Sequence, residues 1–312
     1  HWKHSNELFK DITDLVLLFV MSIDLHLHSE NSDGTDSPEA IIEKAIDIQL
    51  EAISITDHEY LTKVPVSQHI EIIRGVEVSV SWEKLEKSNP FAGIHLLLYF
   101  VKEESPVDTF LEKIRKLKNI RNFEIIENLQ NEGLDVNKSE LNDFKTKVPG
   151  RPHIASILKD KGYVDSINDA FIKYLGNGKI GDSRSHQPDI EKIISLSQES
   201  KCLVFLAHPH TLMSNDKFSK KENWVNDEFY ELVKKLSGFG INGLETTYSS
   251  YSKNISNQIS EVAKKLNLLE CGGSDYHGDI KPNINLGFGY ENTPMKVPYK
   301  FLNDMKEKHG QL

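Results

Sequence analysis

Apolar residues alternate with polar ones, as far as His28, in and just after the first strand that the sequence predicts, residues 22–27. The polar positions include His26 and His28, two residues apart, and a strand has a two-residue side-chain period. Both imidazoles are therefore expected on one face of a short buried strand. The strand runs into Asp33-Gly34, a turn signal that can bring a carboxylate back over its end. An edge strand with chance histidines is the alternative interpretation of this pair alone, because short metal motifs also match by accident.

A helix is predicted to begin at Ser37-Pro38-Glu39, with Ser as N-cap, Pro at the first helical position and an acid in the first turn. Apolar spacing continues it to about Leu50, and residues 52–56 form the next strand. A strand, a helix and a strand in this order indicate a right-handed βαβ unit and a parallel sheet. Further strands are predicted at residues 70–80, 93–100, 202–206, 241–244 and 268–271, and helices at 190–200, 228–236, 252–266 and 299–308.

The pattern changes at Ser105, after which the spacing is helical to about residue 131 and shorter helical stretches follow to about residue 186. No strand is predicted there. We therefore expect an α/β domain in two parts, residues 21–104 and 188–312, with an all-helical insertion at residues 105–187. Residues 1–20 are interpreted as an extension without an assigned role, because Asp11 and Asp14 stand where a signal peptide would carry positive charge.

The formal net charge of -10, from 37 basic and 47 acidic residues, does not favour non-specific binding to duplex DNA or to a membrane. A small phosphorylated substrate remains compatible with it, because metal ions can reverse the local potential. No run reaches the roughly 18 apolar residues of a membrane span. Two cysteines do not suggest a disulfide framework, so a cytoplasmic location is expected. Thirteen histidines are the one excess in the composition.

Candidate metal ligands recur at the C-terminal ends of the predicted parallel strands, and Asp33 in the turn after the first strand is counted with them. They are His26, His28, Asp33, His58, Glu77, His95, His208, Asp275 and His277. In a barrel of parallel strands the C-terminal ends open on one face, so residues far apart in sequence meet in one pocket. Nine ligands fit two or three divalent ions with a bridging carboxylate such as Glu77, and the mixed nitrogen and oxygen set suits Mn, Fe or Zn. A single member could instead orient a ligand from behind.

These residues belong to a series of motifs in a characteristic order, and together the motifs resemble the PHP (polymerase and histidinol phosphatase) superfamily. The motifs are His26-Leu-His28-Ser, Asp33-Gly34, Thr56-Asp57-His58, Gly75-Val-Glu77, His95-Leu-Leu-Leu-Tyr, Ala207-His208-Pro209 and Gly273-Ser-Asp275-Tyr-His277. The resemblance implies a distorted (β/α)7 TIM-like barrel with a trinuclear metal centre. It implies the ligand sets His26, His28, Glu77 and Asp275; Glu77, His95 and His208; and Asp33, His58 and His277.

The expected insertion resembles one branch of that superfamily, which contains 3′,5′-nucleoside bisphosphate phosphatases and enzymes that trim RNA from the 5′ end. The similarity lies in Gly150-Arg151-Pro152-His153-Ile154-Ala155 and in Tyr174-Leu-Gly-Asn-Gly178. It implies that the helical subdomain covers the barrel and that Arg151 binds substrate phosphate. A surface arginine at a helix start is the alternative for Arg151, and His153 is either a second phosphate donor or a packing residue. His210 is a substrate-binding candidate with an open role.

The resemblance and the ligand set predict a phosphoesterase that uses a metal-activated hydroxide. Asp57 is expected to orient His58, with direct acid–base work as the second choice. The favoured substrate is a nucleoside 3′,5′-bisphosphate, with trimming of short RNA 5′ ends as a further activity. The alternatives are a phosphatase of another small monoester, such as histidinol phosphate, and a non-catalytic metal-binding module.

Overall fold

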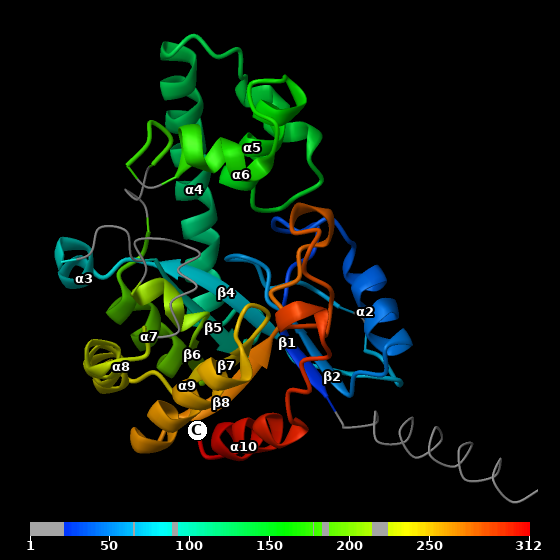
Figure 1. The fold of residues 1–312 in the computed structure, drawn as a ribbon, viewed down its shortest axis with the longest axis vertical. Coiled ribbons are helices and arrows are strands. Elements are labelled where there is room, and N and C mark those ends of the chain that lie inside the picture. The colour runs from blue at the N-terminus through cyan, green and yellow to red at the C-terminus, as the bar shows by residue number, and fades with distance from the viewer. Residues whose placement is uncertain (1–21, 65, 89–92, 177, 183–186, 214–223) are drawn as a thin grey trace, which may run out of the picture.

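The computed structural model describes residues 22–64, 66–88, 93–176, 178–182, 187–213 and 224–312. Within them the chain forms two β-sheets flanked by helices, with a further group of helices at one end of the molecule (Figure 1). The extension expected at residues 1–20 lies outside the described residues. None of the described helices combines the length and the apolar character that a membrane crossing requires.

The strands of the described residues form a three-stranded sheet, in the order β1-β2-β3, and a five-stranded sheet, in the order β4-β5-β6-β7-β8. Their bounds are β1 Ile23–Leu27, β2 Ala52–Ile55, β3 Glu71–Ile72, β4 Gly75–Val80, β5 Ile94–Tyr99, β6 Leu203–Leu206, β7 Gly243–Tyr248 and β8 Leu269–Gly273. Isolated parallel bridges, Leu27 with Tyr276 and His58 with Glu77, connect the two sheets.

The α/β class is confirmed, but the expectation of a uniformly parallel sheet is wrong for β5, which runs antiparallel to both β4 and β6. The apolar run that identifies β5 has the same appearance in either direction, because this strand is buried along nearly its whole length. Strand pairing within the described residues also leaves the two sheets open, so it does not close them into the expected barrel.

Residues 70–80, expected as one strand, form two strands in different sheets. β3 pairs with β2, whereas β4 pairs with β5. The chain thus changes sheets just before Gly75, and Glu77 lies in β4 where the bridge to His58 joins the sheets. This position lets side chains from both sheets reach Glu77.

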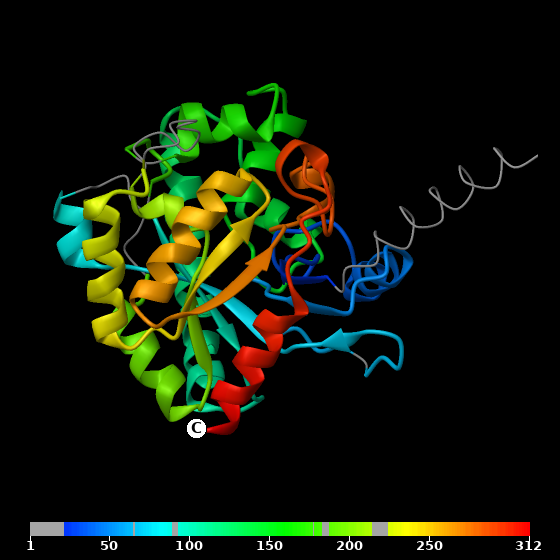
Figure 2. The same ribbon diagram turned by 60° about the horizontal axis from the view of Figure 1, so that its bottom comes forward.

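Helices cover the outer faces of the sheets (Figures 1 and 2). They are α2 Pro38–Asp47, α3 Glu83–Ser88, α7 Ile190–Glu199, α8 Asp227–Phe239, α9 Lys253–Lys265 and α10 Tyr299–Gly310. Short 3-10 helices lie at Pro209–Leu212 (η3), Gly278–Ile280 (η4) and Tyr290–Asn292 (η5). The predicted start of α2 is confirmed, because the Ser37 side chain accepts a hydrogen bond from the Ala40 backbone N–H at 3.2 Å.

The long helix α4, Pro106–Asn131, leaves the sheets and leads into the helical group at the top of Figure 1. The other members of this group are η1 Lys138–Asp143, α5 Arg151–Asp160, α6 Ile167–Ala170 and the π-helix η2 Phe171–Leu175. They pack with the far half of α4 around an apolar core of their own, which includes Ile125, Leu129 and Leu158. Residues 105–176 and 178–182 contain no strand.

Gly273 allows β8 to lie directly against β1. A Cβ atom at this position would lie 2.3 Å from the Cβ of His26 and 2.5 Å from its backbone nitrogen. Since contacts this short do not occur between real atoms, any side chain here would push the two strands apart. The glycine therefore sets the separation between His26 and the residues that follow β8.

Gly273→Ala is expected to lower the free energy of unfolding by about 1–3 kcal/mol, because the added methyl group overpacks the contact between β8 and β1. Gly238→Ala is the matched control: Gly238 lies in α8 with no atom near the added Cβ, and alanine is favoured in helices. Urea unfolding of both variants measures the difference, and equal stabilities would contradict the close approach.

Candidate metal centre

β1 brings His26 and His28 into the interior, where neither has exposed surface. Their ring centroids lie 5.2 Å apart, and the Nε2 atoms of both lie within 3.5 Å of the carboxylates of Glu77 and Asp275. The shared face that the two-residue period predicts is therefore confirmed.

The buried carboxylate of Glu77 is the centre of the group. Five imidazole nitrogens surround its two oxygens: His26 Nε2 at 3.3 Å, His28 Nε2 at 3.0 Å and His58 Nδ1 at 3.4 Å from Oε2, and His95 Nδ1 at 2.7 Å and His208 Nε2 at 2.9 Å from Oε1. These histidines come from both sheets and from the loops that follow their strands. Glu77 is thus placed as a carboxylate that two ions could share.

His95 reaches this group from the beginning of its strand, not from the end. It is the second residue of β5 and pairs in register with Ser79 of β4. Because β5 is antiparallel to β4, the start of β5 lies beside the end of β4. The expected position, at the C-terminal end of a parallel strand, was wrong, although His95 does meet the other residues of the group.

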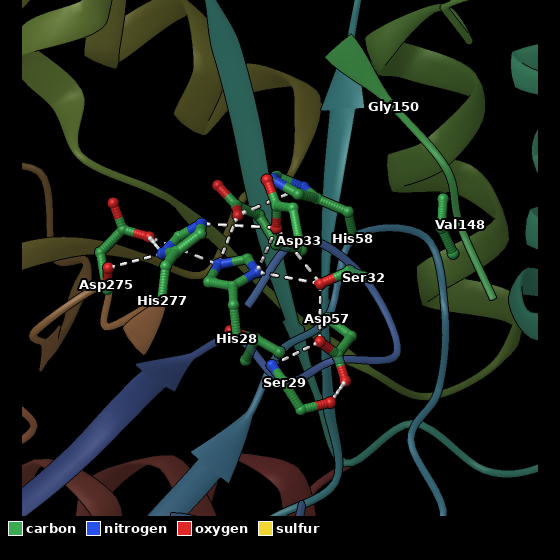
Figure 3. A network of polar contacts seen from close by, with 12 residues as sticks. His28, Ser29, Ser32, Asp33, Asp57, His58, Val148, Gly150, Asp275 and His277 are labelled. Atoms are coloured by element: carbon green, nitrogen blue, oxygen red, sulfur yellow. Dashed lines mark hydrogen bonds and ion pairs between the residues drawn. The ribbon is translucent and has the colours of Figure 1, made fainter. Parts of the chain in front are cut away.

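Asp275 and Asp33 are the other two carboxylates. Asp275 Oδ1 lies 3.5 Å from His26 Nε2, 3.4 Å from His28 Nε2 and 3.4 Å from His277 Nδ1. Asp33 lies 3.4 Å from His277 Nε2, 3.6 Å from His28 Nδ1 and 3.7 Å from His58 Nε2. The nine residues singled out in the sequence therefore meet in one place (Figure 3 labels His28, Asp33, His58, Asp275 and His277).

Three sets of side chains bring their ligand atoms within 4.8 Å of one another. They are His26, His28, Glu77 and Asp275; His28, Asp33, His58 and His277; and His58, Glu77 and His95. The first set equals one that the resemblance implies. The second contains His28 in addition to the implied residues, and the third contains His58 where His208 was implied. The assignment of each residue to an ion stays a prediction.

The chemistry of the donor set fits divalent ions. Four ring nitrogens of the group are buried and have no hydrogen-bond partner among the described residues: His26 Nε2, His28 Nε2, His58 Nδ1 and His208 Nδ1. An unsatisfied buried polar atom costs about 1–3 kcal/mol, and nearly all such atoms have partners. Metal coordination would satisfy these lone pairs, and imidazoles mixed with carboxylates suit Mn, Fe or Zn.

Glu245 in β7 is a residue of this centre that sequence reasoning missed. It is fully buried; its Oε1 lies 2.9 Å from His26 Nδ1, and its Oε2 accepts the backbone N–H of His208 at 2.6 Å. The contact places the ring proton of His26 on Nδ1 and leaves the Nε2 lone pair directed at Glu77. A single charge in the buried strand Gly243–Tyr248 was the available signal.

Asp57 contacts the loop after β1, whereas we expected it to orient His58. Its carboxylate accepts hydrogen bonds from the Ser29 backbone N–H at 2.8 Å, the Ser29 hydroxyl at 2.6 Å, the Ser32 hydroxyl at 2.6 Å and the Thr62 hydroxyl (Figure 3). Ser32 Oγ also lies 3.4 Å from His28 Nδ1. Asp57 therefore positions the loop that carries Asp33 and, through Ser32, the ring of His28.

Asp275 has two further partners that the sequence did not reveal. The Tyr248 hydroxyl and the Lys281 ammonium each donate to its Oδ2 at 2.7 Å. Both contacts leave Oδ1 directed at the histidines, so they orient the carboxylate.

The electrostatics of the group favour ionised carboxylates. Burial alone would raise the pKa of Glu77, but the neighbouring imidazoles of His58, His26 and His95 hold it well below its usual range. Burial would lower the pKa of His28, yet the adjacent carboxylates of Asp275 and Glu77 raise it to about 9. For His58, burial dominates and lowers the pKa to about 3. The imidazoles thus differ in how readily they give up a proton.

The helical group contacts the loop that carries Asp33. The Thr146 hydroxyl lies 2.6 Å from the Ser32 carbonyl oxygen and 3.0 Å from that of Asn31, and the Lys147 backbone N–H donates to Asn31 at 2.9 Å. These contacts hold the segment before α5 against the loop that carries Asp33.

The three substrate-binding candidates lie at different places in the structure. Arg151 begins α5; its Nη1 donates to the Leu175 carbonyl at 3.2 Å, and its guanidinium lies over the Phe171 ring. His153 is buried, and its Nδ1 accepts the Gly150 backbone N–H at 3.1 Å. His210 lies beside His208, with ring centroids 6.0 Å apart.

Comparisons with known proteins agree with this geometry. The profile of the PHP domain family matches residues 24–267. The 5′-3′ exoribonuclease Rnm of Escherichia coli is 27% identical over 293 residues, which cover 86% of this chain and 89% of that protein. A 3′,5′-nucleoside bisphosphate phosphatase of Chromobacterium violaceum is 23% identical over 286 residues, which cover 89% of this chain and 94% of that protein.

A solved structure from Bifidobacterium adolescentis, assigned to the metal-dependent phosphoesterases, superimposes with a TM-score of 0.72. It covers 92% of this chain and 96% of its own, at 20% sequence identity. At this identity the likeness shows a common fold.

Glu245→Gln is expected to weaken metal binding by about 10–100-fold, because an amide cannot accept from both His26 Nδ1 and the His208 backbone. Glu270→Gln is the control, since Glu270 accepts from Thr246 in the adjacent strand. Titration calorimetry with Mn²⁺ measures both affinities. Unchanged affinity in Glu245→Gln would contradict the positioning role.

Metal binding is expected to release protons and to tighten as pH rises. Because the pKa of His28 is raised to about 9, this ring is protonated at pH 7 in the metal-free protein and must lose its proton to coordinate. The apparent affinity should rise by about tenfold per pH unit below that pKa. Calorimetry in buffers of different ionisation enthalpy counts the protons, and a pH-independent affinity would contradict the expectation.

Proposed function

This chain belongs to the PHP domain family and is a metal-dependent phosphoesterase, and from this premise we propose that it hydrolyses a phosphate ester of a nucleoside 3′,5′-bisphosphate. Trimming of short RNA from the 5′ end is a further activity of the same site in this proposal. The observation that carries it is the convergence of six histidines and three carboxylates on one buried position. The proposed class of substrate is supported by the activities in the names of the two relatives.

The nine convergent residues would hold two or three divalent ions, with Glu77 shared between two of them. Bound here, the ions supply Lewis acidity for phosphoryl oxygens and a nucleophilic water at neutral pH. The protein's own part is to hold the donors in place: Glu245 fixes the ring of His26, and Tyr248 with Lys281 fixes Asp275.

His210 is proposed as a neutral hydrogen-bond donor to the substrate. The Tyr251 hydroxyl accepts the His210 backbone N–H at 3.2 Å and lies 2.8 Å from Nδ1. Burial lowers the pKa of His210 to about 3, so the ring is neutral at neutral pH, and in this proposal Tyr251 donates to Nδ1 and the ring proton is on Nε2. A neutral N–H can bind a phosphate oxygen or the leaving oxygen.

Arg151 and His153 complete the proposed substrate site from the helical segment, residues 105–187, which we treat as an insertion over the sheets. A guanidinium presents a planar set of donors that matches phosphate oxygens. His153 lies near the loop that carries Asp33: burial lowers its pKa, and the charge of Asp33 acts in the opposite direction.

A substrate panel tests the proposal. With Mn²⁺ present, the protein is expected to release phosphate from adenosine 3′,5′-bisphosphate and nucleotides from a short 5′-phosphorylated RNA. Release of phosphate from histidinol phosphate alone would support the alternative phosphatase. No hydrolysis of any of these substrates would support a non-catalytic metal-binding module. Chelation followed by readdition of Mn²⁺ should abolish and restore the activity.

Asp275→Ala and His208→Ala test the role of the centre. Each removes a donor of the group, so metal content should fall and turnover should drop by about 100-fold or more. His69→Ala, at an exposed position that belongs to no metal set, is the control. If Asp275→Ala kept normal turnover although its metal content was reduced, this result would contradict the proposed metal-dependent mechanism.

A further inference from the structure

The buried side of α4 changes from apolar to polar and back to apolar along its length. Its buried residues are Val107, Leu111, Ile114, Arg121, Asn122, Ile125, Ile126 and Leu129. The first two pack in the core of the larger sheet, and the last three pack in the core of the helical group. Arg121 and Asn122, together with the nearly buried Lys118, thus lie where α4 passes between the two cores.

Lys118 and Asn122 have clear partners. The Lys118 ammonium forms an ion pair with Glu59, the residue after His58, and Glu59 also accepts the Ser79 backbone N–H at 3.0 Å. The Asn122 amide donates to the Pro149 carbonyl at 2.7 Å. Both contacts tie α4 to segments that border the metal centre.

Arg121 lacks such a partner. Only 6% of its surface is exposed, its Nη2 lies 3.3 Å from the neutral Asn122 Oδ1, and its Nε has no hydrogen-bond partner among the described residues. No carboxylate of the described residues forms an ion pair with Arg121; Glu59, whose charge acts on it, is paired with Lys118. Buried charges are normally paired, and an unpaired one costs several kcal/mol.

The surroundings of Arg121 point to an anionic ligand. Two cations, Lys118 and Arg121, share the single carboxylate of Glu59, which leaves one positive charge uncompensated. Lys118 also lies within electrostatic reach of Asp33, a member of the metal centre. Asn122 holds Pro149, which lies between Val148 and Gly150 in the segment drawn in Figure 3.

We propose that Arg121, with Lys118 beside it, binds a second phosphate group of the substrate, one that is not hydrolysed in the same step. A guanidinium fork with free donors suits phosphate oxygens. The metal centre takes the reacting phosphate, so an anion at Arg121 has to be a different group. This inference rests on the proposed phosphoesterase function and narrows the substrate to esters that carry two phosphates.

The test compares Mn²⁺-loaded wild type with Arg121→Met on adenosine 3′,5′-bisphosphate and on adenosine 3′- and 5′-monophosphate. For the bisphosphate, KM should rise by about 10–100-fold with kcat changed less than about threefold. For the monophosphates, kcat/KM, or Ki where an ester is not turned over, should stay within about threefold. Lys116→Met, at an exposed position of the same helix, is the matched control. Equal effects on all three compounds, or no effect, would overturn the inference.

Thermal unfolding separates this role from a structural one. A methionine fills the same space without an unpaired charge, so the melting temperature of Arg121→Met should be unchanged or raised by about 1–4 °C. A lower melting temperature, or failure to fold, would show that Arg121 is a structural residue and would overturn the inference. Arg121→Lys, which keeps the charge, should show a smaller rise in KM that is again confined to the bisphosphate.

A binding measurement separates failure of the proposed phosphoesterase function from failure of the role proposed for Arg121. If wild type hydrolyses no phosphate ester, the proposed function fails, and calorimetric titration of adenosine 3′,5′-bisphosphate into wild type and Arg121→Met still decides the role of Arg121. If wild type hydrolyses the bisphosphate but Arg121→Met binds it equally well, the inference alone fails.

Discussion

A single buried carboxylate, that of Glu77, organises this protein. It lies in β4, where the larger sheet meets the segment after β2, and five imidazoles surround its oxygens. An ionised carboxylate without exposed surface is stable only when positive or hydrogen-bonding groups compensate it. The two sheets must therefore meet with the geometry seen here, because either sheet alone supplies only part of that compensation.

The position of the site could be predicted from the sequence because most ligands lie on, or directly after, a strand that the local pattern of residues identifies. His26 and His28 occupy one face of a strand, and His58, His208 and Asp275 follow strands that end at the same edge. Strand direction was not predictable in the same way. The apolar run of β5 would look the same in a parallel strand, so only the pairing in three dimensions revealed that His95 lies at the start of its strand.

The residues that orient the ligands could not be predicted either, because their roles depend on contacts with residues distant in sequence. Glu245 meets His26 across a separation of 219 residues, and no motif marks it. Asp57 is next to His58 in the chain, which suggested a direct contact, yet its carboxylate faces Ser29 and Ser32. Neighbours in a motif share a location, but the direction of each side chain is set by the strand and loop geometry around it.

The hydrogen bonds from Thr146 and Lys147 to the carbonyls of Asn31 and Ser32 have an energetic consequence. They join the helical group to the loop that ends in Asp33, so neither can shift without affecting the other. Under the proposed function, a nucleotide that altered these bonds on binding would change the affinity for a cation at Asp33, and by thermodynamic reciprocity that cation would change the affinity for the nucleotide by the same factor. Cation occupancy and nucleotide affinity would then be two aspects of one cooperative equilibrium.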